Sequence, residues 1–298
     1  MSMPRNLPQR FRYCLSRPIA IATLLVLILL PARSAWAGDS IEKQLRSDYS
    51  DKVLTLRHFY SGDRLKFRPD GTLEGYASTG PWTLDGQIEV QEIHLQGAQL
   101  TIKGRRIHSI FDAQHDPQDQ LTTIGDHPDK QRKELEKYLR HLKVEIEIEL
   151  PSDQSDERVV ASAMNAVFLS GSESMMDAVP SYWRAYFAKR EGKPAPKVNG
   201  PVYTFKSGEG MSPPRADVNP EPEYSEEARK AKYQGTIVLS LVVDASGAPR
   251  DLQIVTPLGL GLDEQAVKAV NSWRFRAGAK DGEPVSVAIN VEVSFRLY

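Results

Sequence analysis

Histidine and aspartate side chains gather in one stretch of the sequence and could bind a metal ion. All six histidines lie within residues 58–141. Two of them, His115 and His127, have four aspartates nearby: Asp112, Asp116, Asp119 and Asp126. Imidazole and carboxylate groups are common zinc ligands, but the stretch has no HExxH motif, no paired ligand spacing and no cysteine. We therefore expect a solvated loop here and no metal site.

The sequence also lacks the residue patterns of catalysis. It contains no GxSxG motif, no glycine-rich phosphate loop and no nucleophile beside a base. The Ser170-Gly171-Ser172 stretch is expected to end a helix. We predict no catalytic residue and no cofactor, so the protein is not expected to be an enzyme. A hydrolase within residues 50–150 stays a third hypothesis, which replacement of His94 and His108 would test.

The C-terminal residues 223–298 alternate between helix-forming and strand-forming segments. Ser225 is the expected N-cap of a short helix, which the Gln234-Gly235 pair ends. The β-branched residues 236–243 predict a strand, and a turn with Gly247 leads to a second strand over 249–255. Asp263 is the expected N-cap of a second helix over 264–273, whose apolar residues recur every three or four positions.

A long terminal strand is predicted over residues 285–297. Its apolar residues alternate with polar ones: Val285, Val287, Ile289, Val291, Val293, Phe295 and Leu297. Period-2 alternation indicates a strand with one buried face and one wet face. With the preceding elements, it predicts an α+β domain with a three-stranded antiparallel sheet and two helices.

Several residues at fixed places in this segment form a signature. They are Tyr224, Gly235, Gly247, Asp263 after Leu262, Ala266, Val270, Trp273-Arg274-Phe275, and Pro284-Val285 before a closing aromatic strand. In this pattern, which covers about a quarter of the chain, the segment resembles the TonB C-terminal domain. The family usually has Tyr-Pro where this chain has Tyr224-Ser225. A proline in the first helical turn is favourable but not required.

The resemblance implies a mechanical function. Family members bind a short extended segment of an outer-membrane receptor, the TonB box, as an added strand of the sheet. In the family the last strand is the binding edge, which here comprises Val285, Val287, Ile289, Asn290, Val291, Val293 and Phe295. A charge at Ile289, or a proline at Asn290, is expected to abolish this binding. Alternatively, these residues are plain core and a second copy covers the edge, as in a homodimer.

The N-terminal residues 1–37 have the features of a secretory signal peptide. Four arginines precede the apolar run from Ile19 to Leu30, and Ala35-Trp36-Ala37 fits a cleavage site. A short uncleaved anchor is the alternative. Cleavage would remove five arginines, the lone Cys14 and no acidic residue, so the net charge would fall from −1 to −6. We expect a periplasmic protein that has no disulfide and does not bind nucleic acid.

Three segments are predicted between the signal peptide and residue 223. Residues 40–150 have short alternating runs and turn signals, which predict a mostly antiparallel β domain with one helix, either barrel-like or a curled sheet. Residues 151–190 predict helices that pack on this domain, the last of them rich in aromatic residues. Residues 191–222 contain seven prolines and predict an extended, semi-rigid linker.

Two functional hypotheses follow. In the first, the chain is a TonB-like energy transducer that supports uptake through outer-membrane receptors and also contacts the inner-membrane proton-motor complex. In the second, it is a soluble periplasmic adaptor or scaffold that uses the same edge strand without energy coupling. The apolar run near the N-terminus has Thr23 as its one polar residue, and this favours the second hypothesis.

Overall fold

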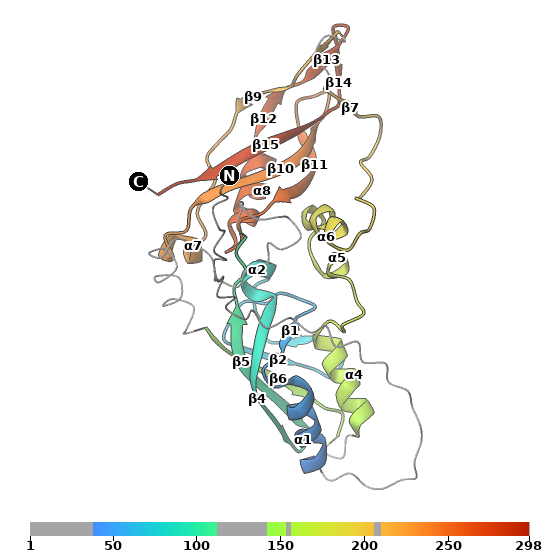
Figure 1. Cartoon of the computed structure of the whole chain (residues 1–298), viewed down its shortest axis with the longest axis vertical. Coiled ribbons are helices and arrows are strands. Elements are labelled where there is room, and N and C mark those ends of the chain that lie inside the picture. The colour runs from blue at the N-terminus through green and yellow to red at the C-terminus, as the bar shows by residue number, and fades with distance from the viewer. Residues whose placement is uncertain (1–37, 112–141, 153–155, 206–209, 298) are drawn as a thin grey trace, which may run out of the picture.

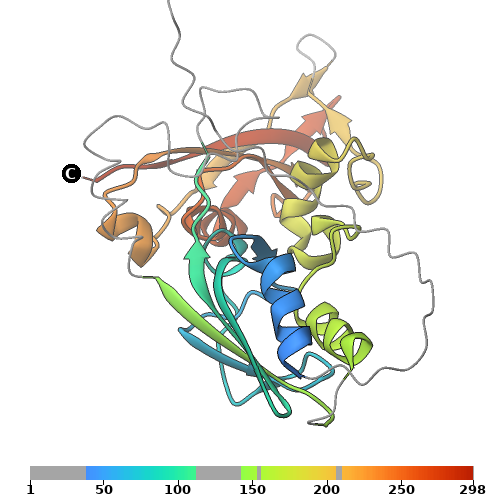
Figure 2. The same ribbon diagram turned by 60° about the horizontal axis from the view of Figure 1, so that its bottom comes forward.

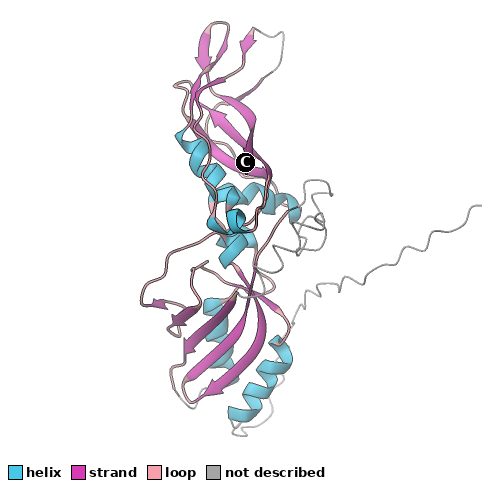
Figure 3. Ribbon diagram, turned by 90° about the vertical axis from the view of Figure 1, so that its left-hand side faces the viewer, coloured by secondary structure: helices cyan, strands magenta, loops and turns pink. Residues whose placement is uncertain are grey.

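Two β-sheets lie at opposite ends of the elongated protein, with helices between and beside them (Figures 1 and 3). The computed structural model describes residues 38–111, 142–152, 156–205 and 210–297. The expected signal peptide and the stretch with His115 and His127 lie outside these residues. No described helix is long and apolar enough to cross a membrane.

The N-terminal sheet is open and has six strands in the order β1-β4-β5-β6-β2-β3. Their bounds are β1 Val53–Thr55, β2 Arg64–Phe67, β3 Leu73–Glu74, β4 Gln87–Gln96, β5 Gln99–Ile107 and β6 Lys143–Glu149. Four of the five strand pairings in this sheet are antiparallel, and among the described residues the sheet does not close into the predicted barrel. Strands β2 and β6 pair in parallel. The end strands β1 and β3 do not pair among the described residues, because strands of three and two residues offer too few backbone groups to close a barrel.

Alternating residues make one face of this sheet the core. In β6, Val144, Ile146 and Ile148 are buried while the glutamates between them are partly exposed. Helices α1 (Gly38–Tyr49) and α4 (Glu157–Val167) lie side by side against the sheet (Figures 1 and 2). The Asp156 side chain caps α4 by accepting two backbone N–H groups.

Helix α1 also covers the outer edge of β4. The Leu95 N–H donates to Glu42 Oε2 at 2.6 Å, and Arg46 Nε donates to the Ile93 carbonyl oxygen at 2.8 Å. The Glu42 and Arg46 side chains therefore bond to backbone groups of β4 that are not paired with a strand. With these groups satisfied, this edge of β4 is protected from pairing with another chain.

The C-terminal sheet has four strands in the order β11-β10-β15-β7. Strands β10 (Gly235–Val243), β11 (Pro249–Thr256) and β15 (Val287–Phe295) form the predicted antiparallel sheet. Strand β7 (Tyr203–Thr204) adds a fourth strand in parallel. Val285 lies outside the terminal strand, because it belongs to β14 (Glu283–Val285), which pairs with β13 (Gly278–Lys280).

Two helices accompany this sheet. Helix α7 (Glu226–Lys230) begins after Ser225, whose hydroxyl accepts the Ala228 N–H as predicted. Helix α8 (Leu262–Ser272) begins two residues earlier than predicted, with Gly261 at the N-cap position. Asp263 therefore lies inside the first turn, where it is free to bond to the preceding loop.

The segment 191–222 is not a free spacer along its described length. Three short strands within it pair with the C-terminal domain: β7 with β15, β8 (Met211–Ser212) with β13, and β9 (Arg215–Val218) with β12 (Arg274–Arg276). Proline lacks a donor but keeps its carbonyl, so proline-rich chain can still form short pairings between its prolines.

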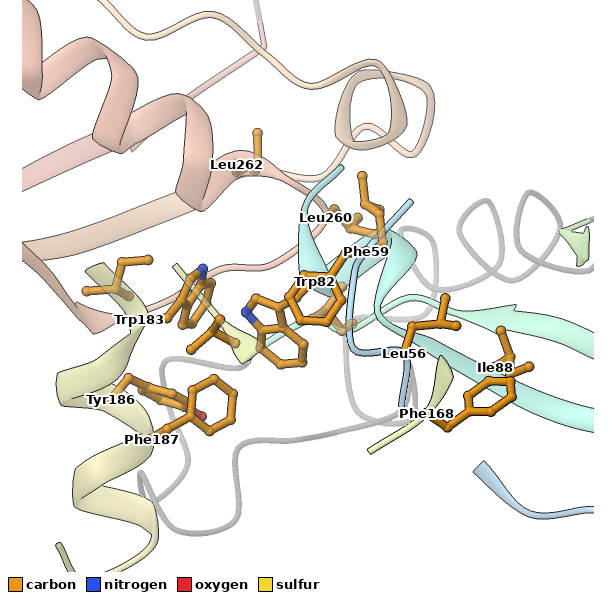
Figure 4. Packing of buried hydrophobic residues seen from close by; sticks show 14 of the residues in the cluster. Leu56, Phe59, Trp82, Ile88, Phe168, Trp183, Tyr186, Phe187, Leu260 and Leu262 are labelled. Atoms are coloured by element: carbon orange, nitrogen blue, oxygen red, sulfur yellow. The ribbon is translucent and has the colours of Figure 1, made fainter. Parts of the chain in front are cut away.

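One continuous hydrophobic core joins the two halves. Helices α2 (Trp82–Asp85), α5 (Met175–Ala178), η1 (Ser181–Trp183) and α6 (Arg184–Arg190) lie near the junction (Figure 1). Figure 4 shows Trp183, Tyr186 and Phe187 directed toward Trp82, and the Trp82 and Trp183 ring centroids are 5.2 Å apart. The aromatic helix thus packs on both halves, whereas the sequence predicted packing on the N-terminal domain alone.

Backbone pairing reinforces this junction. Ile110 and Gly259 form an isolated antiparallel bridge. The Phe111 N–H donates to the Leu258 carbonyl oxygen at 3.0 Å, and the Leu260 N–H donates to the Ser109 carbonyl oxygen at 3.1 Å. The two halves are therefore connected by directional hydrogen bonds as well as by apolar packing.

A buried polar group lies in the N-terminal half close to this junction. Arg106 donates to the carbonyl oxygens of Asp85, Tyr60 and Gly62 at 2.7–2.8 Å. His108 follows two residues later and is 5% exposed, and among the described residues its Nδ1 has no hydrogen-bond partner. Burial, with the Arg106 charge adding to its effect, lowers the pKa of His108 to about 4.

Candidate partner-binding edge

The two faces of β15 differ in burial. Val287, Val293 and Phe295 are buried in the core, and Ile289 and Val291 are partly buried on the same face. The residues between them point the other way, and Asn290, Glu292 and Ser294 among them are exposed. The alternation predicted for this strand is therefore present from residue 287 to residue 295.

The direction of the backbone groups follows from the β7 contact. The Tyr203 N–H donates to the Ser286 carbonyl oxygen at 2.9 Å, and Tyr203 pairs with Val287 in parallel register. In a parallel ladder, this directs the backbone groups of Ser286 and Ala288 outward, away from β10. Since no register shift interrupts the β10–β15 pairing, every second residue repeats this orientation.

The outward backbone groups beyond β7 belong to Asn290, Glu292 and Ser294. Within the described residues, no strand pairs with β15 on this side after Ala288. Of these three residues, the sequence identified Asn290 alone. Alternation shows which residues share a direction, but only a known hydrogen bond shows which set faces outward.

The opposite edge of the same sheet is covered. Helices η1 and α6 lie against β11, and the Ala185 N–H donates to Gln253 Oε1 at 3.1 Å. Long outer edges of the two main sheets are therefore covered by helices at β4 and at β11. In the described part of the chain, β15 after Ala288 is a long edge with neither a paired strand nor such a helix.

The signature residues lie in the core of the domain and hold it together. The Tyr224 ring packs edge-on against Phe295, with centroids 5.3 Å apart. A side chain on Gly235 would approach Leu258 to 2.5 Å, and one on Gly247 would contact the Phe275 carbonyl oxygen.

The remaining signature residues are also structural. Ala266 in α8 is completely buried. Trp273 Nε1 donates to the Pro220 carbonyl oxygen at 3.1 Å, and the Phe275 N–H donates to the Gly247 carbonyl oxygen at 3.0 Å. Phe295 connects the two predicted groups, because it belongs to the edge strand and packs on the signature residue Tyr224.

The Asp263 side chain stabilises the loop that contacts the N-terminal half. Its carboxylate accepts the Leu258 N–H at 2.9 Å and the Gly259 N–H at 2.7 Å. Burial raises the pKa of Asp263, and the neighbouring Glu264 carboxylate adds to the rise. Burial also raises the pKa of Glu264, against the hydrogen bond that Trp183 Nε1 donates to Glu264 Oε1 at 2.9 Å. The sequence reasoning missed this contact, although the aromatic residues around Trp183 were visible in it.

The described residues contain no group of three or more histidine, cysteine, aspartate or glutamate side chains placed to hold a metal ion. The feature that remains is a backbone edge flanked by side chains of β15. In proteins generally, an edge of this kind is where an extended segment can add as a further strand.

Comparison with known proteins identifies this domain. Residues 220–297 match the family described as Gram-negative bacterial TonB protein C-terminal. Protein tonB2 of Pseudomonas aeruginosa is 35% identical over 80 residues, which are 26% of this chain and 30% of that protein. Protein TonB of Vibrio cholerae is 32% identical over 78 residues, which are 26% of this chain and 32% of that protein.

Residues 220–297 are therefore a TonB family C-terminal domain. The chain spans about a third of the length of these two relatives. A solution structure of the Pseudomonas aeruginosa TonB C-terminal domain aligns with 32% of this chain and 94% of its own, at 15% identity and a TM-score of 0.25. A TM-score this low carries no argument about the fold.

Proposed function

We propose that this protein is a TonB-like periplasmic binding module that recognises outer-membrane receptors by β-strand addition and supports energy-coupled transport. The observation that carries the proposal is the regular edge of β15 from Ile289 to Phe295. Its outward backbone groups at Asn290, Glu292 and Ser294 match the hydrogen bonds that an extended receptor segment needs.

The covered edges support the same proposal. Proteins protect long sheet edges because unpaired backbone groups attract other chains. Here α1 covers β4, and η1 with α6 covers β11, while β15 has no such cover among the described residues. An edge left open in a chain that covers its other long edges is best explained by a partner that pairs with it.

A soluble adaptor or scaffold without energy coupling is the second candidate. It is favoured by the described part of segment 191–222, whose strands β7, β8 and β9 fold back onto the C-terminal domain. A segment bound in this way adds little reach between membranes. In this function the edge would pair with another periplasmic protein or with a second copy of the chain.

A peptide array tests the proposal. The full chain is applied to short peptides tiled over the periplasmic N-terminal segments of outer-membrane receptors from the same organism. Asn290→Pro removes an outward N–H, and a proline is tolerated where the N–H does not serve the ladder to β10. Asn290→Ala is the matched control, because it removes the side chain and keeps the N–H.

We expect the unmodified chain and Asn290→Ala to bind the same peptides and Asn290→Pro to lose them. Equal binding by all three would show that the outward edge is not the binding site. If no receptor peptide binds and the chain dimerises, with Asn290→Pro monomeric, the edge serves a scaffold and the receptor function is wrong.

A further inference from the structure

The edge of β15 is already occupied at one end by the chain itself. Strand β7 pairs with Val287 and Ala288, and its Tyr203 N–H donates a hydrogen bond to the Ser286 carbonyl oxygen. The parallel register directs the Ala288 N–H at the Tyr203 carbonyl group. An incoming strand therefore finds the first two outward positions of this edge taken.

Contacts on both sides of β7 keep it in this place. Asn199 before it lies 3.5 Å from Asp251 of β11, between Nδ2 and Oδ1. The Lys280 ammonium group lies 4.8 Å from the centroid of the Tyr203 ring. After β7, the chain pairs again through β8, where the Ala279 N–H donates to Ser212 Oγ at 3.1 Å. A strand anchored before and after its pairing is a fixed part of the domain.

The outward groups that remain free lie over one short stretch. Within the described residues, the outward groups that no strand pairs with belong to Asn290, Glu292 and Ser294, and the strand ends at Phe295. At roughly 3.4 Å per residue, this stretch accommodates an added strand of about six residues. A longer paired segment would collide with Thr204 or Phe205 at one end of the site.

We propose that β7, held by the Tyr203 N–H bond to Ser286, ends the receptor-binding edge and limits the length of the segment that can pair with it. This inference rests on the proposed receptor-binding function and adds a specificity determinant to it. Strand β7 selects short paired segments, since extra residues gain no further backbone hydrogen bonds in its presence.

The test uses the full chain and two forms of the array peptide that binds most strongly. One form has about six residues, and the other is extended by about three residues at each end. Tyr203→Pro removes the N–H that bonds to Ser286. Thr204→Pro is the matched control, because the Thr204 N–H points away from β15 in this register. Tyr203→Ala controls for loss of the ring.

We expect the short peptide to bind all four proteins equally. The long peptide is expected to bind Tyr203→Pro about tenfold more tightly than the unmodified chain, since it gains two hydrogen bonds. Hydrogen exchange of the free proteins should be faster at the Ala288 amide in Tyr203→Pro alone, and the long peptide should protect that amide again.

Four results would overturn the inference. Equal affinity of the long peptide for the unmodified chain and Tyr203→Pro would show that β7 sets no limit, as would unchanged exchange at Ala288. A gain for both peptides would make β7 a general competitor for the edge. Failure of both peptides to bind any of the proteins would reject the receptor function as well, so the two failures can be told apart.

Discussion

Replacement of Gly259 by alanine is expected to weaken the junction between the two halves. Gly259 has a φ of +89° and forms the bridge to Ile110. An added Cβ would contact the Ser109 carbonyl oxygen and lie 2.9 Å from the Ile110 Cα atom. Gly282 is a matched control because it has a φ of +90° and no heavy atom within 4 Å of an added Cβ.

The structure separates two costs of these substitutions. The positive φ costs an L-residue about 1–2 kcal/mol, and both variants share it. Gly259→Ala must also displace the Ser109 and Ile110 backbone, which costs about 1–3 kcal/mol as overpacking. This displacement weakens two hydrogen bonds across the junction, worth about 1 kcal/mol each. We therefore expect Gly259→Ala to lose about 2–4 kcal/mol more unfolding free energy than Gly282→Ala.

Equilibrium urea denaturation of the full chain measures this difference. Tryptophan fluorescence follows the junction directly, because Trp82 and Trp183 are both buried there. The unfolding free energies of the unmodified chain and of the two variants are compared at one temperature. Equal losses of unfolding free energy in the two variants would refute the reasoning. The close contact of Gly259 with the other half would then add nothing to the cost of the positive φ that both variants share.

Two further predictions concern buried groups. The pKa of His108 is lowered to about 4, so the folded protein keeps this side chain neutral. The resulting stability is complete above about pH 6.5 and is lost as the pH falls from about 6.5 to about 4. When the pH is lowered from about 7.5 to about 4.5, the unmodified chain should lose about 2–3 kcal/mol more unfolding free energy than His108→Asn. An equal loss in the two proteins would contradict this prediction. Trp183→Phe removes the indole N–H that donates to the Glu264 carboxylate, and Trp273→Phe is the control that removes the donor to Pro220. In the same denaturation assay, Trp183→Phe should lose about 1–3 kcal/mol more unfolding free energy than Trp273→Phe. Equal losses would show that the bond to Glu264 is not stabilising.

Local patterns in the sequence were sufficient for the C-terminal domain. The hydroxyl of Ser225, the turn at Gly247 and the alternation along residues 287–295 act over a few residues, and the structure has each of them. The predicted start of helix α8 was wrong, because the helix begins at Leu262 with Gly261 at the N-cap position. Asp263 fits the usual N-cap chemistry, but its carboxylate bonds to the N–H groups of Leu258 and Gly259 in the preceding loop.

The N-terminal half was predicted less well for a physical reason. Alternation shows that a segment is a strand with one wet face, but strand order depends on pairings between distant residues. The parallel pairing of β2 with β6 joins residues about 80 positions apart, and no local signal specifies it. Closure into a barrel depends on the same kind of long-range pairing.

The sequence by itself determined that the last strand alternates and that its segment resembles a TonB C-terminal domain, because side-chain periodicity and turn chemistry are local properties. The tertiary structure decided which backbone groups of that strand are free. The β7 bond to Ser286, the helical cover of β11 and the bridge at Gly259 all join residues far apart in the chain. Hydrogen bonds between distant segments form only in the folded chain, so the position and length of the proposed binding edge are properties of the fold.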